Sequence, residues 1–440
     1  MADETKIPGS SGLPLLGETL AFIGGPYRFV SDRLQKHGRV FRSHLLGKPC
    51  VVVSGPEAAK LFTDHDQVQR EGSQPSNVFA LFAGPSVPHL DGDAHRERKA
   101  LLMQAFTRDA ITHYLPAMQA HVEASFARWA TAGELRWMAA MQRLSVESVC
   151  ESILGEREGP RVDELVRHYR AIDKAFTGVP VALPGSAYAK GLSALESILV
   201  IFRAMVAEHR AKPSKDGLSR ILTHKTPAGS TLDDDAAARE MHHMIIAGRI
   251  VWSHMATLAI ELSKAPAIRE RLEREVRELA PEGALTVEGL RAMPYLDALV
   301  REVKRASPVV PSVFGLAKRE IVFEGKTIAK GTMLMLGLRA SHELGDVYER
   351  PEAFDPERFL APRAEDERHP HGFFPHGPGQ FMTSHHCAGT DYATTLTKVF
   401  AIVLARGYRY ELPPQALEYR WNQLTPEPRD GLRVVLTARA

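Results

Sequence analysis

Apolar residues recur at helical spacing over most of the chain. The pattern runs from Ala94 to about Arg210, with glycine and proline breaks at 155–159 and 180–184. Apolar positions three to four residues apart indicate amphipathic helices. Residues 233–265 form a longer segment that is apolar on almost every side and stops before a proline. We therefore expect one long central helix there.

Strand-like segments are short. Arg39–Leu46 and Val51–Val53 are rich in apolar and β-branched residues, and Gly47-Lys48-Pro49 between them predicts a hairpin turn. Another β-rich stretch covers 321–338, and hairpin material ends the chain. Residues 68–92 are rich in glycine and proline and predict a long loop of the kind that often lines a binding site. The expected fold class is mainly α with small β sheets.

Composition limits the class of protein. The 440 residues are 44% hydrophobic and 25% charged, which is ordinary for a globular protein. The net charge of +2 argues against a nucleic-acid partner, which would need a strongly basic surface. We expect a single domain over 1–440, with a β-rich N-terminal lobe at about 36–55 and a helical body at about 93–310.

The cysteines and the N-terminus indicate a cellular compartment. Cys50, Cys150 and Cys387 are too few, and odd in number, for a disulfide framework, and they indicate a reducing environment. The first residues include acids and lack an apolar segment, so we expect no signal peptide and no membrane anchor. The expected location is the cytoplasm.

Cys387 follows a loop punctuated by glycine and proline. Residues 373–389 read Phe-Phe-Pro-His-Gly-Pro-Gly-Gln-Phe-Met-Thr-Ser-His-His-Cys-Ala-Gly and deliver the thiol to the start of an apolar helical run. A thiolate there can ligate haem iron and push electron density toward cleavage of an O–O bond. The positive end of the helix dipole favours the thiolate. The alternative is an inert buried cysteine, and patterns elsewhere in the chain weigh against it.

Two charged patterns precede that loop. Glu302 and Arg305 are three residues apart on a predicted helix, so they share a face and can pair. Arg358 lies in Phe-Asp-Pro-Glu-Arg-Phe, about thirty residues before Cys387. A second arginine at that place can join the pair in a buried, forked network. Taken alone, such a pair is a common surface feature.

In this order and at this spacing, the three patterns resemble the cytochrome P-450 superfamily. The resemblance covers nearly the whole chain. It implies the P-450 fold, with the long central helix over haem b and Cys387 as the axial ligand of the iron. It also implies that Glu302, Arg305 and Arg358 hold the fold and take no part in the chemistry.

The resemblance also implies contacts to the haem propionates. The segment His95-Arg96-Glu97-Arg98-Lys99 looks like the family's helix that reaches the propionates, which assigns this role to His95 and Lys99. The usual cysteine loop has arginine two residues before the cysteine, where this chain has His385. We expect His385 to replace that arginine. The other interpretation is an ordinary polar loop residue.

The central helix departs from the common pattern of the superfamily. Its monooxygenases usually carry an acid followed by threonine where this chain has Arg249 and Ile250. Neither residue can relay protons as that pair does. A guanidinium among apolar residues is costly when it has no partner, so Arg249 must reach water, pair with an acid elsewhere, or bind a ligand. We expect it to bind a substrate carboxylate, which suits its planar fork.

In these departures from the common pattern, the chain resembles the branch of hydrogen-peroxide-dependent fatty-acid peroxygenases and decarboxylases. That resemblance implies that Arg249 holds the carboxylate of a fatty acid, that hydrogen peroxide is the oxidant, and that no redox partner is required. The expected reaction is hydroxylation at the α or β carbon, or oxidative decarboxylation. Ile250, Phe79, Phe82 and Val87 are expected to line the substrate pocket.

Three differences from that branch leave the product open. The branch has proline where this chain has Ile250, arginine where it has His386, and glutamine or histidine where it has Pro88. His89, next to Pro88, either takes over the role of that residue or is an ordinary loop histidine.

Other functions fit the same sequence. One is a monooxygenase of a natural product, driven by NAD(P)H through a redox partner. Another is an isomerase or lyase of fatty-acid hydroperoxides, which also needs no dioxygen relay. A non-enzymatic haem sensor is a further alternative.

Overall fold

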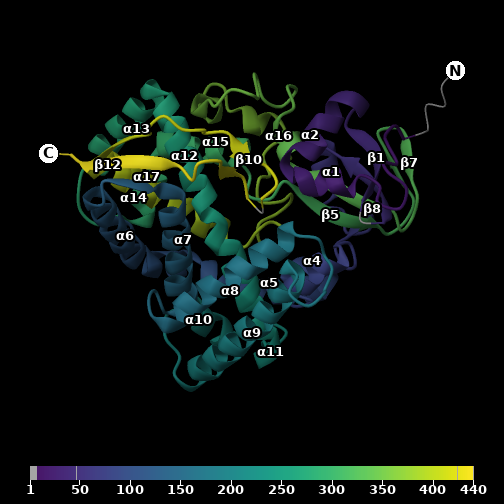
Figure 1. The fold of residues 1–440 in the computed structure, drawn as a ribbon, viewed down its shortest axis with the longest axis horizontal. Helices are drawn as coiled ribbons and strands as arrows, with labels where there is room; N and C mark the ends of the chain where they lie inside the picture. Colours follow the sequence, from purple (N-terminus) through teal and green to yellow (C-terminus); the bar gives the residue numbers. More distant parts are fainter. Residues whose placement is uncertain (1–6, 46, 424, 440) are drawn as a thin grey trace.

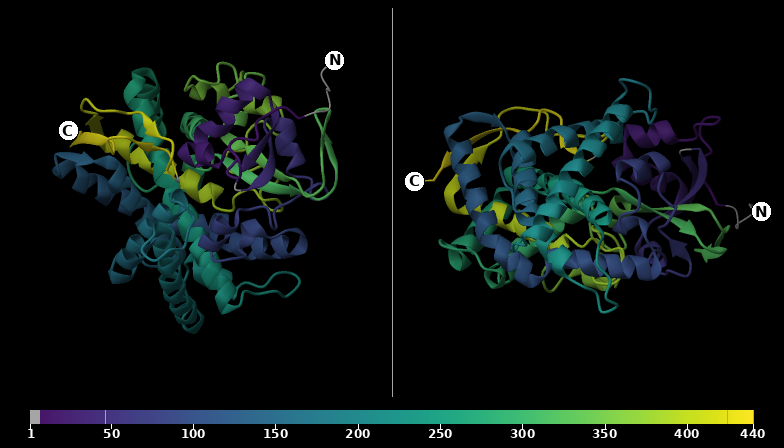
Figure 2. Two further views of the ribbon diagram at one scale, coloured as in Figure 1. Left: turned by 45° about the vertical axis from the view of Figure 1, so that its right-hand side comes forward. Right: turned by 90° about the horizontal axis from the view of Figure 1, so that it is seen from below.

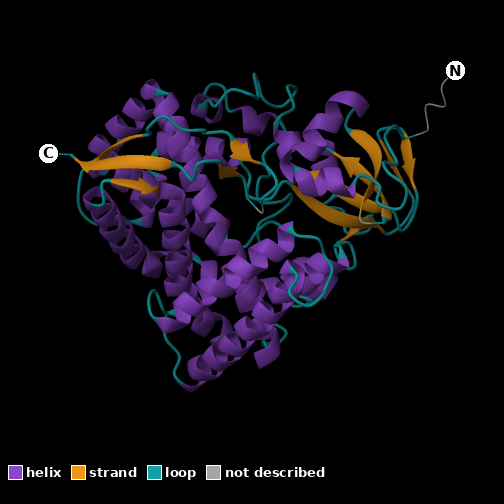
Figure 3. Cartoon of the chain, viewed as in Figure 1, coloured by secondary structure: helices purple, strands orange, loops and turns teal. Residues whose placement is uncertain are grey.

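A computed structural model of the protein describes residues 7–45, 47–423 and 425–439. Leu46, which ends the first predicted β-rich run, lies outside the described residues. The chain is mainly helical, with short strands gathered in small sheets (Figure 3). This agrees with the expected fold class.

The α-helices are α1 Thr19–Gly24, α2 Pro26–His37, α3 Pro56–Leu61, α4 Ser76–Leu81, α5 Gly92–Leu102, α6 Arg108–Thr131, α7 Trp137–Leu154, α8 Pro160–Thr177, α9 Ala187–Ala211, α10 Gly217–Thr223, α11 Asp234–Gly248, α12 Trp252–Lys264, α13 Pro266–Leu279, α14 Val287–Arg291, α15 Pro294–Ala306, α16 Leu338–His342 and α17 Thr390–Gly407. The 3-10 helices are η1 Val87–His89, η2 Met103–Phe106, η3 Arg249–Val251, η4 Pro356–Phe359 and η5 Glu365–Arg368. The strands are β1 Val40–Leu45, β2 Lys48–Val53, β3 Val68–Gln69, β4 Glu134–Arg136, β5 Ser312–Ala317, β6 Ile321–Phe323, β7 Lys326–Ile328, β8 Met333–Gly337, β9 Tyr408–Glu411, β10 Tyr419–Arg420, β11 Glu427–Pro428 and β12 Arg433–Ala438.

The predicted N-terminal hairpin forms part of a five-stranded sheet with strand order β1-β2-β8-β5-β3. Lys48 and Pro49, predicted in the turn, belong to β2 and pair with Leu45 and His44. The turn is tighter than predicted because Gly47 has a φ of +77°, a left-handed conformation that glycine adopts at little cost. Figure 1 shows this sheet at one end of the molecule, near the N-terminus, with the C-terminus at the other end.

The segment predicted as a long loop, 68–92, is partly helical and contains α4 and η1. Two side chains of α11 hold it in place. Glu240 accepts a hydrogen bond from the N–H of Val87 at 2.9 Å, and Nε2 of His242 donates to the carbonyl of Leu81 at 2.9 Å. These long-range contacts give the segment an order that its glycine and proline content does not predict.

The predicted central helix is divided at Arg249. α11 ends at Gly248, η3 forms one 3-10 turn, and α12 continues to Lys264. A Cβ on Gly248 would lie 2.5 Å from Cγ2 of Val149 on α7, so only glycine allows this close approach. The three pieces run through the middle of the molecule (Figure 2). The span Asp234–Lys264 is long and apolar enough to cross a membrane, but most of it is buried inside the fold.

Most of the helices and the C-terminal strands share one apolar core, which extends from Leu81 to Leu436. The N-terminal sheet packs around separate apolar clusters on its two sides. Within the main core, η3 contacts both α7 and α17. Because α17 begins three residues after Cys387, the divided part of the central helix lies against the helix that follows the cysteine.

Candidate active site

Backbone hydrogen bonds place Cys387 just before α17. Its N–H donates to the carbonyl of His376 at 2.9 Å, and its carbonyl accepts a hydrogen bond from the Thr390 hydroxyl at 2.8 Å. Cys387 is exposed as a residue, but its thiol is enclosed closely enough for desolvation to raise its pKa. The N–H of Gly389 and two lysine ammonium groups act in the opposite direction without reversing that rise. These donors and cations are the groups that stabilise a thiolate.

The two lysines are Lys99 and Lys304, and both are buried. Lys99 Nζ donates to the carbonyls of Ser384 and His386, the second at 2.6 Å. Lys304 Nζ donates to Oγ1 of Thr394 at 2.5 Å. These two carbonyls use two of the three donors of the Lys99 ammonium group, and contact of Lys99 with a propionate stays a prediction. Its contacts hold the cysteine loop.

His95 and His385, predicted near the propionates, lie side by side. Their ring centroids are 4.0 Å apart, and Nε2 of His385 lies 3.5 Å from Oδ1 of Asp91. Burial lowers the pKa of His95 to about 3 and that of His385 to about 4. Among the described residues, Nε2 of His385 has no hydrogen-bond partner of good geometry. Donors and cations around the Cys387 thiol, and a buried ring nitrogen of His385 without a hydrogen-bond partner among the described residues, fit a thiolate-ligated haem.

Glu302, Arg305 and Arg358 meet in one buried network. Arg305 donates two hydrogen bonds to Glu302, at 2.7 and 2.8 Å, and Nε of Arg358 lies 3.2 Å from the same carboxylate. Arg358 also pairs with Glu365 at 2.7 Å. Because all four side chains are at most 2% exposed, the network joins α15 to the η4–η5 segment without access to water.

Arg249 lies in η3, and its side chain is directed toward α8. NH1 donates to Oδ2 of Asp173 at 2.9 Å, and NH2 donates to Oδ1. The guanidinium carbon lies 5.0 Å from the centroid of the Tyr169 ring. Arg249 thus pairs with a protein acid, one of the alternatives that the sequence leaves open, and its binding of a substrate carboxylate stays a prediction. A buried guanidinium requires such a counter-charge.

A cleft of about 150 Å³ surrounds the Arg249–Asp173 pair. Ile250 and Trp252 line it from the central helix, and Tyr169 lines it from α8. Its remaining walls come from α7 and from the C-terminal segment that includes β11. Arg249 and Ile250 thus line the same cleft, and their role in a substrate pocket stays a prediction.

The predicted pocket residues Phe79, Phe82 and Val87 do not line this cleft. The rings of Phe79 and Phe82 pack edge-on against His89, with centroids 5.0 and 5.6 Å away. Val87 is buried in the same η1 turn. The structure does not bring these residues together with Arg249, because η1 faces the Glu240 side of α11.

His89 is a buried structural residue. Its Nδ1 lies 3.1 Å from Oγ of Ser86, and its Nε2 lies 2.9 Å from Oε1 of Gln74. Burial lowers the pKa of His89 to about 4. Since both ring nitrogens have protein partners, His89 ties η1 to the segment before α4.

Sequence reasoning missed Asp173 and Tyr169. They are four residues apart on α8, so they share a helix face. Asp173 and Arg249 are 76 residues apart, and no local pattern links them.

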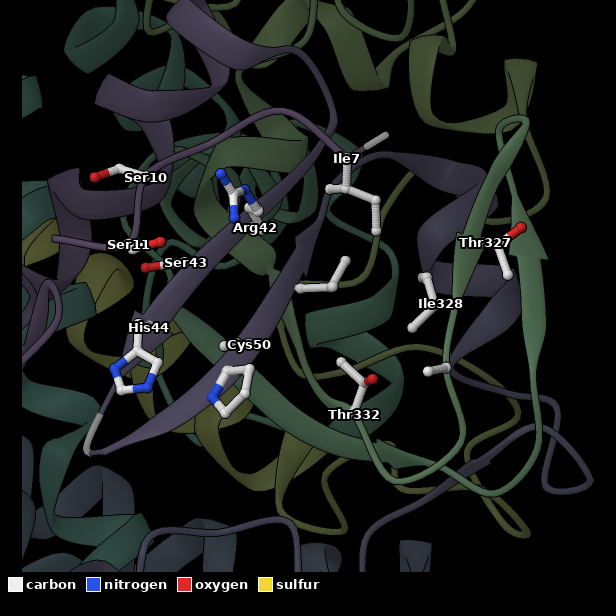
Figure 4. A pocket seen from close by; sticks show the side chains of 13 residues that line it. Ile7, Ser10, Ser11, Arg42, Ser43, His44, Cys50, Thr327, Ile328 and Thr332 are labelled. Carbon is white, nitrogen blue, oxygen red and sulfur yellow. The ribbon is translucent and has the colours of Figure 1, made fainter. Parts of the chain in front are cut away.

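A second cleft lies in the N-terminal lobe (Figure 4). Its volume is about 270 Å³, and β1, β2, the chain before α1 and the end of β7 line it. Its polar side chains include Ser10, Arg42 and His44. None of the predicted site residues lines this cleft.

Comparisons with known proteins agree with this arrangement. The cytochrome P-450 family model matches residues 7–429. Cytochrome P-450 26B1 of Danio rerio is 28% identical over 448 residues, which cover 98% of this chain and 86% of that protein. A solved structure of cyanobacterial CYP120A1 with retinoic acid bound has a TM-score of 0.91 and 28% identity, over 98% of this chain and 99% of that one. Cytochrome P-450EX alpha (CYP152N1) with myristic acid has a TM-score of 0.82 and 25% identity, over 99% and 100% of the two chains.

One family model thus spans almost the whole chain. The cysteine loop and the buried Glu302–Arg305–Arg358 network are structural features expected of that family. The chain belongs to the cytochrome P-450 family of oxidoreductases, whose haem b is held by a cysteine thiolate.

Proposed function

We propose that this enzyme uses hydrogen peroxide to hydroxylate, or oxidatively decarboxylate, an elongated apolar carboxylic acid. The observation that carries the proposal is the Arg249–Ile250 pair in the divided central helix. By the resemblance to the superfamily, a cation and an aliphatic side chain stand where an acid and an alcohol would deliver protons to dioxygen. An oxidant that already contains reduced oxygen does not need that relay to the same extent.

The ligands of similar proteins support the class of substrate. The CYP120A1 structure contains retinoic acid, and the CYP152N1 structure contains myristic acid. Both ligands join one carboxylate to a long apolar body. An arginine beside a partly apolar cleft suits such a molecule, because its fork binds the carboxylate while Ile250 and Trp252 contact the chain.

In the proposed reaction, Cys387 holds the haem, which supplies the oxygen-transfer chemistry. Arg249 positions the substrate carboxylate, and that carboxylate accepts and returns the protons of hydrogen peroxide, in place of a protein acid. Lys99 and the Gly389 N–H favour the thiolate form of Cys387, against the desolvation that raises its pKa. The proposed enzyme is cytoplasmic and requires no redox partner.

The test compares two oxidant systems on the haem-loaded protein. We expect myristic acid to be converted with hydrogen peroxide alone, and the products to be identified by mass spectrometry. NAD(P)H with ferredoxin and its reductase should support less turnover than peroxide does. Replacement of Arg249 by alanine should lower peroxide-dependent kcat/KM about 100-fold or more, whereas Arg203→Ala, at an exposed arginine of α9, should leave it unchanged.

Two results would reject the proposal. Turnover only with NAD(P)H and the electron-transfer proteins would indicate a conventional monooxygenase. Rapid conversion of a fatty-acid hydroperoxide without any added oxidant, together with no reaction of myristic acid, would indicate an isomerase or lyase.

A further inference from the structure

The two side chains of the Arg249–Asp173 pair differ in their exposure to solvent. The Arg249 side chain is 9% exposed, whereas that of Asp173 is 37% exposed. The cation therefore lies deep in the cleft and its partner near the opening. Nε of Arg249 is buried and has no hydrogen-bond partner among the described residues, so the guanidinium is not saturated by Asp173.

The cleft offers more than one charge near Asp173. Arg170 and Lys174 line it from α8, and Glu427 lines it from β11. Burial raises the pKa of Glu427, and Asp173 adds to that rise, which places the two carboxylates within electrostatic reach of each other. An Asp173 that leaves Arg249 thus remains in a cleft that two cations of its own helix also line.

We propose that Asp173 is an internal competitor for the substrate carboxylate: it occupies Arg249 in the resting enzyme, and the substrate displaces it. This inference rests on the proposed function, because it names the residue that an acid substrate must replace. The fork of one arginine binds one carboxylate in the two-armed geometry, so Asp173 and a substrate carboxylate exclude each other.

The exchange has a physical rationale. A lone buried guanidinium costs several kcal/mol in the absence of a counter-ion, and Asp173 removes that cost while no substrate is bound. A substrate carboxylate restores the same ion pair, and Asp173 regains its hydration at the opening of the cleft. A neutral analogue cannot form an ion pair with Arg249, so it leaves the Arg249–Asp173 pair intact.

Asp173 therefore lowers the affinity for acids without affecting neutral analogues. The apparent dissociation constant of an acid rises in inverse proportion to the fraction of enzyme in which Arg249 is free. If Arg249 is free about a tenth of the time, removal of the competitor strengthens acid binding about tenfold.

The experiment titrates the ferric, haem-loaded protein with myristic acid and with methyl myristate, and follows the haem absorption spectrum. We expect Asp173→Asn to lower the Kd of the acid about tenfold and to leave that of the ester within about twofold. Glu164→Gln is the matched control, since Glu164 is an exposed acid on the same helix, and it should change neither Kd. The double variant Arg249→Gln, Asp173→Asn should bind the acid no more tightly than the ester.

A thermal unfolding measurement distinguishes a change in affinity from a folding defect of the variant. Myristic acid should raise the Tm of Asp173→Asn more than that of the wild type, because ligand stabilisation grows with affinity. Acid binding that is unchanged or weaker in Asp173→Asn, with normal binding by the wild type, would overturn this inference and leave the proposed function standing. A wild type that binds neither compound would overturn both.

Discussion

At the scale of single residues, the cysteine loop depends on a lysine that lies far from it in sequence. Lys99 on α5 donates to the carbonyls of Ser384 and His386, which flank Cys387 on its N-terminal side. The same ammonium group lowers the pKa of the Cys387 thiol. One buried cation therefore positions the loop and favours the charge state that ligates iron.

Replacement of Lys99 by methionine should weaken the haem site. Two carbonyls would lose their donor, at a cost of about 1–3 kcal/mol for each group that stays unsatisfied, and the thiolate would lose a nearby cation. We expect a lower haem-to-protein ratio, and a larger share of thiol-ligated species in the spectrum of the ferrous carbon monoxide complex. Arg96→Met is the control, because Arg96 is exposed on the same helix and pairs with Asp93. Full haem content with an unchanged spectrum in Lys99→Met would contradict this role.

At the scale of secondary-structure elements, the division of the central helix coincides with a close contact to α7. Gly248 packs against Val149, with no room for a Cβ, and η3 follows at once. The 3-10 turn changes the direction of the Arg249 side chain relative to that in a continuous α-helix. The contact with α7 and the pairing with α8 thus belong to one local arrangement.

Gly248→Ala tests this contact. Alanine has the better helix propensity, by less than about 1 kcal/mol, but the overpacking against Val149 should cost about 1–3 kcal/mol. We expect a net loss in the free energy of unfolding, measured by urea titration. Gly407→Ala at the end of α17, where a Cβ meets nothing within 4 Å, should be neutral or slightly stabilising. In the double variant Gly248→Ala, Val149→Ala the losses should be less than additive, and strict additivity would show that the two residues do not interact.

At the scale of the whole molecule, the Glu302–Arg305–Arg358 network connects α15 to the chain that leads into the cysteine loop. Glu302 also accepts a hydrogen bond from the N–H of Asp355 at 2.8 Å, and Arg358 donates to carbonyls of Glu349 and Ala353. Separate parts of the chain therefore share one buried set of charges, and its loss should affect the fold as a whole.

Glu302→Gln should be strongly destabilising. It leaves two buried guanidinium groups short of negative charge, and removal of one partner from a buried ion pair typically costs about 3–5 kcal/mol. We expect a lower Tm and poor haem retention. Asp32→Asn, in an exposed pair with Arg28, should change stability by less than about 1 kcal/mol. Equal stability of Glu302→Gln and the wild type would show that the network does not hold the fold.

The sequence by itself determined the features whose signals are local. Helical periodicity located most helices, and the motifs around Cys387, Glu302 and Arg358 indicated the cytochrome P-450 family. Such features depend only on how many residues separate two positions in a helix. Glu302 and Arg305, three residues apart, share a helix face independently of the tertiary structure. The sequence also showed that residues 249 and 250 cannot form the usual proton relay.

Only the tertiary structure decided what Arg249 contacts. Its partner lies 76 residues away on α8, and the direction of its side chain depends on a 3-10 turn within a predicted α-helix. Likewise, the fold brings Lys99 to the carbonyls of Ser384 and His386, which no local pattern predicts. In both cases a buried charge takes the partner that packing brings within reach, because a charge without water or a counter-charge is too costly to keep.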